Sequence, residues 1–100
     1  MDTYEVIITP DAEFDLQSIR DYLAYNIGGR NTALSQIRSI RHVIGSLQTM
    51  PARSRLVDEE PWRSRGIRKI IVGNYYVYYR IDDHAKRVYV LNVVLARSIK

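Results

Sequence analysis

The spacing of apolar residues along the chain changes from a strand-like to a helix-like period and back again. Residues 4–8 form a short run rich in β-branched residues, which predicts a strand. Apolar residues then recur at spacings of three and four in two successive stretches, first Ala12, Leu16, Ile19, Leu23 and Ile27, and then Ala33, Ile37, Ile40, Ile44 and Leu47. Each stretch places its members in one apolar stripe, which predicts two amphipathic helices.

Residues at the ends of these stretches are typical of helix termini. Thr9 is suited to cap the first helix, Pro10 suits the first helical position and Asp11 adds a negative charge to the first turn. Gly28 and Gly29 are expected to end that helix, and Asn31 to cap the second one, which should end before Pro51. Two helices joined by so short a turn are expected to pack as an antiparallel hairpin.

The second half of the chain returns to a strand-like pattern after a polar loop over residues 52–65. We predict strands over residues 67–72, 75–81 and 88–95, with Gly73-Asn74 forming a two-residue hairpin turn between the first two. The order β-α-α-β-β-β predicts a single α+β domain over residues 1–100. Its helical hairpin should pack on one face of a small, mostly antiparallel sheet.

Alternation along these strands predicts which side chains face the helices. In the strand 75–81, the core set is Tyr75, Val77, Tyr79 and Ile81, and the open set is Tyr76, Tyr78 and Arg80. The last strand is apolar on both faces, with Val88, Val90 and Val94 on one face and Tyr89, Leu91, Val93 and Leu95 on the other. Part of the second sheet face is therefore expected to be covered, by this chain or by another.

Charge is distributed unevenly along the chain. Residues 1–50 contain four arginines and six acids, a net charge of −2. Because the whole chain has a net charge of +4, residues 51–100 have a net charge of +6.

There are no cysteines, which excludes disulfides and thiolate metal sites and fits a reducing compartment. No apolar stretch approaches the roughly 20 residues of a membrane span, and residues 1–5 lack the basic region of a signal peptide. We therefore expect a cytoplasmic protein with no membrane contact.

The segment 62–81 combines a basic loop, two predicted strands and several tyrosines. Cations interleaved with aromatic rings suit a phosphate-rich partner. The nucleic-acid-binding candidates are Arg63, Arg65, Tyr78 and Arg80. The remaining polar candidates, His42, His84 and the run Asp58-Glu59-Glu60, are expected to be solvated residues with no catalytic role. We expect no metal site. Trp62 is expected to be a core residue.

Four segments together resemble the RelE/ParE superfamily of toxins from bacterial type II toxin–antitoxin modules, which stabilise plasmids. These are residues 4–16, residues 60–68 with Pro61-Trp62-Arg63-Ser64-Arg65-Gly66, residues 74–82 with Tyr75-Tyr76-Val77-Tyr78-Tyr79-Arg80, and Val94-Leu95-Ala96-Arg97. The resemblance implies a growth-inhibiting toxin that a cognate antitoxin holds inactive. It also implies that operator DNA is bound only through the antitoxin, and that no cofactor is needed. An antitoxin segment is expected to place acidic residues over positions 65–69.

Two activities occur in this superfamily: RelE-like members cleave messenger RNA on the ribosome, whereas ParE-like members poison DNA gyrase. Metal-independent RNA cleavage needs a proton acceptor for the 2′-hydroxyl, cations for the phosphorane and a donor for the leaving oxygen. The resemblance implies these roles for Lys69 with the adjacent Arg68, and for Arg97. Tyr76 stands where RelE-like members have an arginine, and no tyrosine follows Arg97.

These residues favour the hypothesis of an mRNA interferase, a metal-independent endoribonuclease that acts on ribosome-bound mRNA through Arg68, Lys69, Tyr76 and Arg97. Two alternatives stay open. One is a ParE-like gyrase inhibitor without catalytic activity of its own, which the long helical hairpin and the incomplete RelE-like set favour. The other is a degenerate toxin that only binds its antitoxin.

Overall fold

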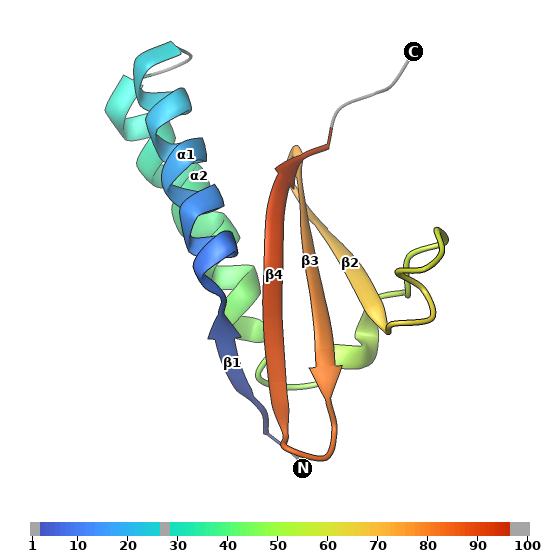
Figure 1. Cartoon of the computed structure of the whole chain (residues 1–100). Coiled ribbons are helices and arrows are strands. Elements are labelled where there is room, and N and C mark those ends of the chain that lie inside the picture. Colours follow the sequence, from blue (N-terminus) through green and yellow to red (C-terminus); the bar gives the residue numbers. More distant parts are fainter. Residues whose placement is uncertain (1–2, 27–28, 97–100) are drawn as a thin grey trace.

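Two helices and a four-stranded sheet form two layers, and the predicted order of elements is confirmed (Figure 1). The computed structural model describes residues 3–26 and 29–96. The elements are β1 (Glu5–Ile8), α1 (Pro10–Asn26), α2 (Gly29–Ser46), a 3₁₀ turn (Pro51–Arg53), β2 (Ile67–Val72), β3 (Tyr75–Asp82) and β4 (Arg87–Leu95).

The strands lie in the order β1-β4-β3-β2. The pairs β2–β3 and β3–β4 are antiparallel, and β1 is parallel to β4 at one edge, so the sheet is mostly antiparallel as predicted. A parallel pair requires a long crossover connection, and the helical hairpin lies within that connection. The hairpin packs along one face of the sheet and extends beyond its end (Figure 1).

The core lies between the hairpin and this sheet face. It contains the described residues of both predicted helical stripes and the predicted core set of β3. Ile19 and Ile81 are partly buried and pack against it. The other members are less than a tenth exposed: Ala12, Leu16, Leu23, Ala33, Ile37, Ile40, Ile44, Leu47, Tyr75, Val77 and Tyr79. Ile27 lies outside the described residues. Tyr79 is fully buried, and its hydroxyl donates a hydrogen bond to the Pro51 carbonyl at 2.6 Å. This bond joins the centre of the sheet to the chain that leaves α2.

The predicted start of α1 is confirmed, but the predicted start of α2 is wrong. Thr9 Oγ1 accepts a hydrogen bond from the Ala12 amide at 3.3 Å and donates one to the Val90 carbonyl at 2.7 Å. The second helix begins at Gly29, so Asn31 lies within its first turn and does not precede it. Glycine is tolerated at a helix start, and asparagine can either precede a helix as its cap or lie within the first turn. The local sequence therefore did not distinguish a start at Gly29 from a start after Asn31.

A β-bulge in β4 corrects the predicted faces of that strand. Tyr78 pairs with Asn92 whereas Tyr79 pairs with Val90, so Leu91 is an extra residue. The extra residue reverses the alternation beyond it: Val93 is buried with Val88 and Val90, whereas Val94 is exposed. At the edge of β4 beside α1, the Asp15 carboxylate accepts a hydrogen bond from the Val93 amide at 2.9 Å.

The predicted turn at Gly73-Asn74 is confirmed, with Val72 paired to Tyr75 across it. Gly73 has a φ of +59°, and Asn74 is not among the residues with positive φ. A glycine in the left-handed region at the first of two turn positions is the geometry of a type II′ hairpin, whose twist matches that of its strands.

Replacing Tyr79 by phenylalanine should lower the free energy of unfolding by about 1–3 kcal/mol, because the Pro51 carbonyl would lose its donor in a buried site. The measurement is urea denaturation followed by circular dichroism. Tyr25→Phe is the matched control, since Tyr25 is 87% exposed and its substitution should change stability by less than about 0.5 kcal/mol. Equal stabilities of the two variants would contradict the structural role of the Tyr79 hydroxyl.

Candidate functional site

The sheet face opposite the helices carries cations stacked on aromatic rings. As predicted, Tyr76, Tyr78 and Arg80 alternate with the buried residues of β3 and are each partly exposed. Lys69 is paired with Tyr78 in register, so it projects to the same face, and its Nζ lies 4.3 Å from the centre of the Tyr76 ring. Arg80 lies 4.8 Å from the Tyr89 ring centre. Three neighbouring strands thus contribute to one aromatic and cationic surface, which we call the open face.

The chain between the 3₁₀ turn and β2 covers the free edge of β2; we call residues 54–66 the 54–66 loop. The Val57 amide donates to the Ile67 carbonyl at 2.9 Å, and the Lys69 amide donates to the Arg55 carbonyl at 3.2 Å. These two bonds continue the sheet by a short extended segment. The predicted polar loop is therefore partly extended and partly a series of tight turns, and its position is fixed by backbone hydrogen bonds.

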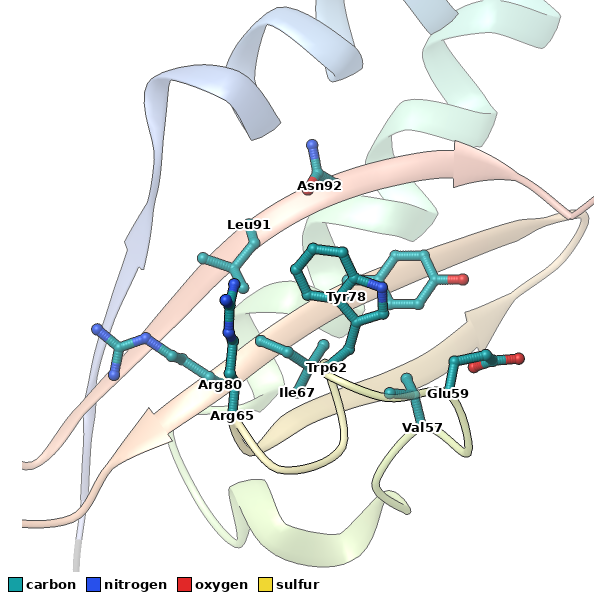
Figure 2. A pocket seen from close by; sticks show the side chains of 9 residues that line it. All are labelled: Val57, Glu59, Trp62, Arg65, Ile67, Tyr78, Arg80, Leu91 and Asn92. Atoms are coloured by element: carbon teal, nitrogen blue, oxygen red, sulfur yellow. The ribbon is translucent and has the colours of Figure 1, made fainter.

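An open groove of about 790 Å³ lies between the 54–66 loop and the open face (Figure 2). Its floor and walls are formed by aliphatic, aromatic and charged side chains: Val57, Glu59, Trp62, Arg65, Ile67, Tyr78, Arg80, Leu91 and Asn92. The prediction that Trp62 is a core residue is wrong, since its side chain is 49% exposed and lines the groove. The tight turns of the loop direct its ring across the open face, and the Arg65 guanidinium lies 5.2 Å from its ring centre.

The three predicted catalytic residues that the structure describes do not all lie on one face of the sheet. Lys69 and Tyr76 are in contact on the open face. Arg68 is paired with the buried Tyr79, so its side chain leaves β2 on the face that the helices cover, and its guanidinium donates to the Ser54 carbonyl at 2.5 Å. Arg97 lies outside the described residues. The sheet itself separates Arg68 from Lys69.

Three of the four predicted nucleic-acid-binding residues lie together: Arg65, Tyr78 and Arg80 line the groove. The fourth, Arg63, lies 3.8 Å from the Asp58 carboxylate and donates to the Val57 carbonyl at 3.2 Å, so it stabilises the 54–66 loop.

Sequence reasoning missed several residues of the groove, namely Val57, Glu59, Leu91 and Asn92. For the groove position of Trp62, one signal was available: Trp62 and Arg65 are three residues apart, a spacing that brings the two side chains together within a turn. Alternation along β4 already placed Leu91 on the open face with Tyr89, but nothing in the local sequence indicated that the bulge would bring Asn92 to that face as well.

Hydrogen bonding and burial shift the pKa values of two groups, Glu60 in the 54–66 loop and Tyr79 in the core. The Ser64 hydroxyl and the Ser64 amide donate to the Glu60 carboxylate and lower its pKa, which keeps this carboxylate charged at the turn. Burial raises the pKa of the Tyr79 phenol, which therefore stays protonated and donates to Pro51.

Among residues 3–26 and 29–96, no group of three histidine or acidic side chains is arranged to hold a metal ion, and no helix is long and apolar enough to cross a membrane.

Comparison with known proteins identifies the family. The model of the ParE toxin of the type II toxin–antitoxin system parDE matches residues 6–99. The chain belongs to the ParE toxin family. This result confirms the resemblance to RelE/ParE toxins, and the protein is the toxin of a type II toxin–antitoxin module with a cognate antitoxin as its partner.

Solved structures of related toxins share the fold of this ParE-family toxin at low sequence identity. The chromosomal ParDE system from P. aeruginosa has 19% identity and a TM-score of 0.79, over 95% of this chain and 98% of the other. The RelBE2 complex from Mycobacterium tuberculosis has 24% identity and a TM-score of 0.66, over 97% of each chain. A mutant of E. coli RelE in the free state has 15% identity and a TM-score of 0.62, over 95% and 85% of the chains. No match was found among curated proteins.

The contrasting positions of Arg68 and Lys69 give a direct test. Arg68→Ala should lower the free energy of unfolding by about 1.5–3 kcal/mol, because it removes a charge-assisted hydrogen bond to the Ser54 carbonyl. Lys69→Ala removes only a stacked surface cation and should cost about 0.5–1 kcal/mol. Thermal unfolding of the two purified variants measures both values. A more stable Arg68→Ala than Lys69→Ala would contradict the structural role of Arg68.

Proposed function

We propose that this ParE-family toxin arrests growth by inhibiting DNA gyrase in the cytoplasm. The family model supports this target, because ParE-like members of the superfamily poison gyrase. The observation that carries the proposal is the position of Arg68, whose guanidinium is bound to the Ser54 carbonyl on the face opposite to Lys69 and Tyr76. A chain that binds and inhibits another enzyme needs a complementary surface, and it does not need an assembled acid–base set.

RNA cleavage would place stricter demands on the same residues. A proton acceptor, a donor and cations must all lie within hydrogen-bond reach of one phosphate. The pair of Lys69 and Tyr76 supplies one cation and one phenol, and the phenol ring is already stacked against the ammonium group. This pair contains neither an imidazole nor a carboxylate, the groups that most often accept a proton in such a reaction.

A second candidate function, cleavage of ribosome-bound mRNA, is favoured by one observation. The groove contains a carboxylate, two guanidinium groups and a phenol, contributed by Glu59, Arg65, Arg80 and Tyr78. In this reading Glu59, and not Tyr76, would accept the proton of the 2′-hydroxyl, and the arginines would stabilise the phosphorane. This candidate predicts a different critical residue from the hypothesis based on sequence.

The two candidates differ in what the purified toxin does in vitro. Gyrase inhibition should block the supercoiling of relaxed plasmid DNA and should leave mRNA intact when ribosomes are added. In cells, induction should elicit the SOS response without new cleavage sites in transcripts, as mapped by primer extension. Cleaved transcripts within minutes of induction, together with fully active gyrase, would refute gyrase inhibition and would support RNA cleavage.

Glu59→Gln separates the candidates within the toxin itself, because it keeps the shape of the side chain and removes its basicity. Gyrase inhibition predicts that growth arrest is unchanged by this substitution. RNA cleavage predicts a loss of about 10²–10⁴-fold in cleavage rate, the usual contribution of a general base. The measurement is the survival of induced cultures at matched protein levels, with co-expressed antitoxin as the control that the arrest is due to the toxin.

A further inference from the structure

The groove between the 54–66 loop and the open face has an apolar centre and charged ends. Val57, Ile67 and Leu91 supply its aliphatic surface, and the rings of Trp62 and Tyr78 lie beside them (Figure 2). Figure 2 shows Arg65 and Arg80 on one side of Trp62, and Glu59 on the other. A molecule that fits this groove therefore needs an apolar centre, an acid at one end, and a base or hydrogen-bond donor at the other.

The two arginines at the positive end are available for an anion. Among the described arginines, five make ion pairs with carboxylates, namely Arg20, Arg41, Arg55, Arg63 and Arg87. Arg65 and Arg80 make none; they lie on the rings of Trp62 and Tyr89. Stacking occupies the face of a guanidinium and leaves its N–H groups free to donate to a carboxylate in a bidentate arrangement. It also reduces the conformational entropy that binding would cost.

We propose that this groove binds one segment of the cognate antitoxin, with a large apolar side chain in its centre, acidic residues against Arg65 and Arg80, and a basic or amide side chain against Glu59. The proposal rests on the assignment of the chain as an antitoxin-bound toxin and is independent of whether gyrase or mRNA is the target. Trp62 and the two arginines are then the residues that select the antitoxin.

The groove suits a peptide better than a nucleic-acid strand. Its centre is aliphatic, whereas strand binding requires cations that follow the phosphates along the whole path. Glu59 lies in the groove and repels phosphate groups at its end. A volume of about 790 Å³ is the size of a ligand pocket and holds a few side chains of an extended segment. The single exposed tryptophan and the two arginines are residue types that commonly dominate binding energy in protein interfaces.

The test uses Trp62 as its own probe, because it is the only tryptophan of the chain. The binding partner is the full-length protein encoded by the adjacent reading frame, with any tryptophan in it replaced by phenylalanine. Binding should shift the Trp62 emission to shorter wavelength and protect the ring from acrylamide quenching, since the half-exposed indole becomes covered. A tight complex with unchanged Trp62 emission and quenching would overturn the proposal, because the groove would then be unoccupied.

Charge variants identify the groove as the site that discriminates between partners. Arg65→Gln and Arg80→Gln should each weaken antitoxin binding roughly tenfold or more by isothermal titration, and Glu59→Arg should weaken it as well. Arg38→Gln is the matched control: it removes one exposed arginine from α2, and affinity should stay within about twofold. Equal losses for Arg38→Gln and Arg65→Gln would overturn the proposal, since binding would then depend only on net charge.

Two further measurements separate this proposal from the proposed function. A fluorescein-labelled 20-nucleotide RNA is titrated against the same variants; if RNA affinity falls on groove substitution and antitoxin affinity does not, the groove is an RNA site and the proposal is wrong. Toxicity of each variant without antitoxin is recorded in parallel. Failure of gyrase inhibition would change the type of growth arrest and leave the antitoxin affinities as stated, so the two failures have different signatures. Circular dichroism melts confirm that every variant is folded.

Discussion

The hydrogen bond from the Tyr79 hydroxyl to the Pro51 carbonyl is the interaction on which the functional half of the molecule depends. Tyr79 lies in β3, between β2 and β4, and is fully buried, while Pro51 begins the 3₁₀ turn that precedes the 54–66 loop. The 54–66 loop has no helix of its own to stabilise it. Its path is fixed by this bond, by the bond from Arg68 to Ser54 and by the bonds along the edge of β2. Because the loop forms one wall of the groove, the site depends on a contact in the core.

Much of this architecture was predictable from the sequence because burial decides it. The stripes at spacings of three and four form one face of each helix, and β3 alternates between core and open face along its whole length. The same alternation already implies that neighbours such as Arg68 and Lys69 lie on opposite faces of a strand, so adjacency in sequence was misleading for a joint catalytic role. The bulge at Leu91 was not predictable, because an extra residue in a strand that is apolar on both faces does not change its pattern.

The position of Trp62 was unpredictable for a different reason. Composition favours burial of a large aromatic residue, but the geometry of the 54–66 loop decides its environment, and turns are specified by hydrogen bonds among neighbours such as Glu60 and Ser64. A chain of 100 residues buries only part of its apolar surface on folding. The surface that remains is concentrated in the groove, beside guanidinium groups that are stacked and unpaired, which is the composition of an interface before its partner arrives.

The carboxylate of Asp15 at the edge of β4 has a consequence for how copies of the toxin behave toward one another. β1 pairs with β4 only as far as Val90, so the later residues of β4 have no strand paired with them on that side, and such an edge is where a strand of another molecule can add. Asp15 already accepts the Val93 amide proton, and its negative charge repels the carbonyl oxygens of an approaching strand. One acidic side chain from a helix thus occupies a main-chain donor at the edge of an apolar strand, which disfavours edge-to-edge pairing between copies of the toxin.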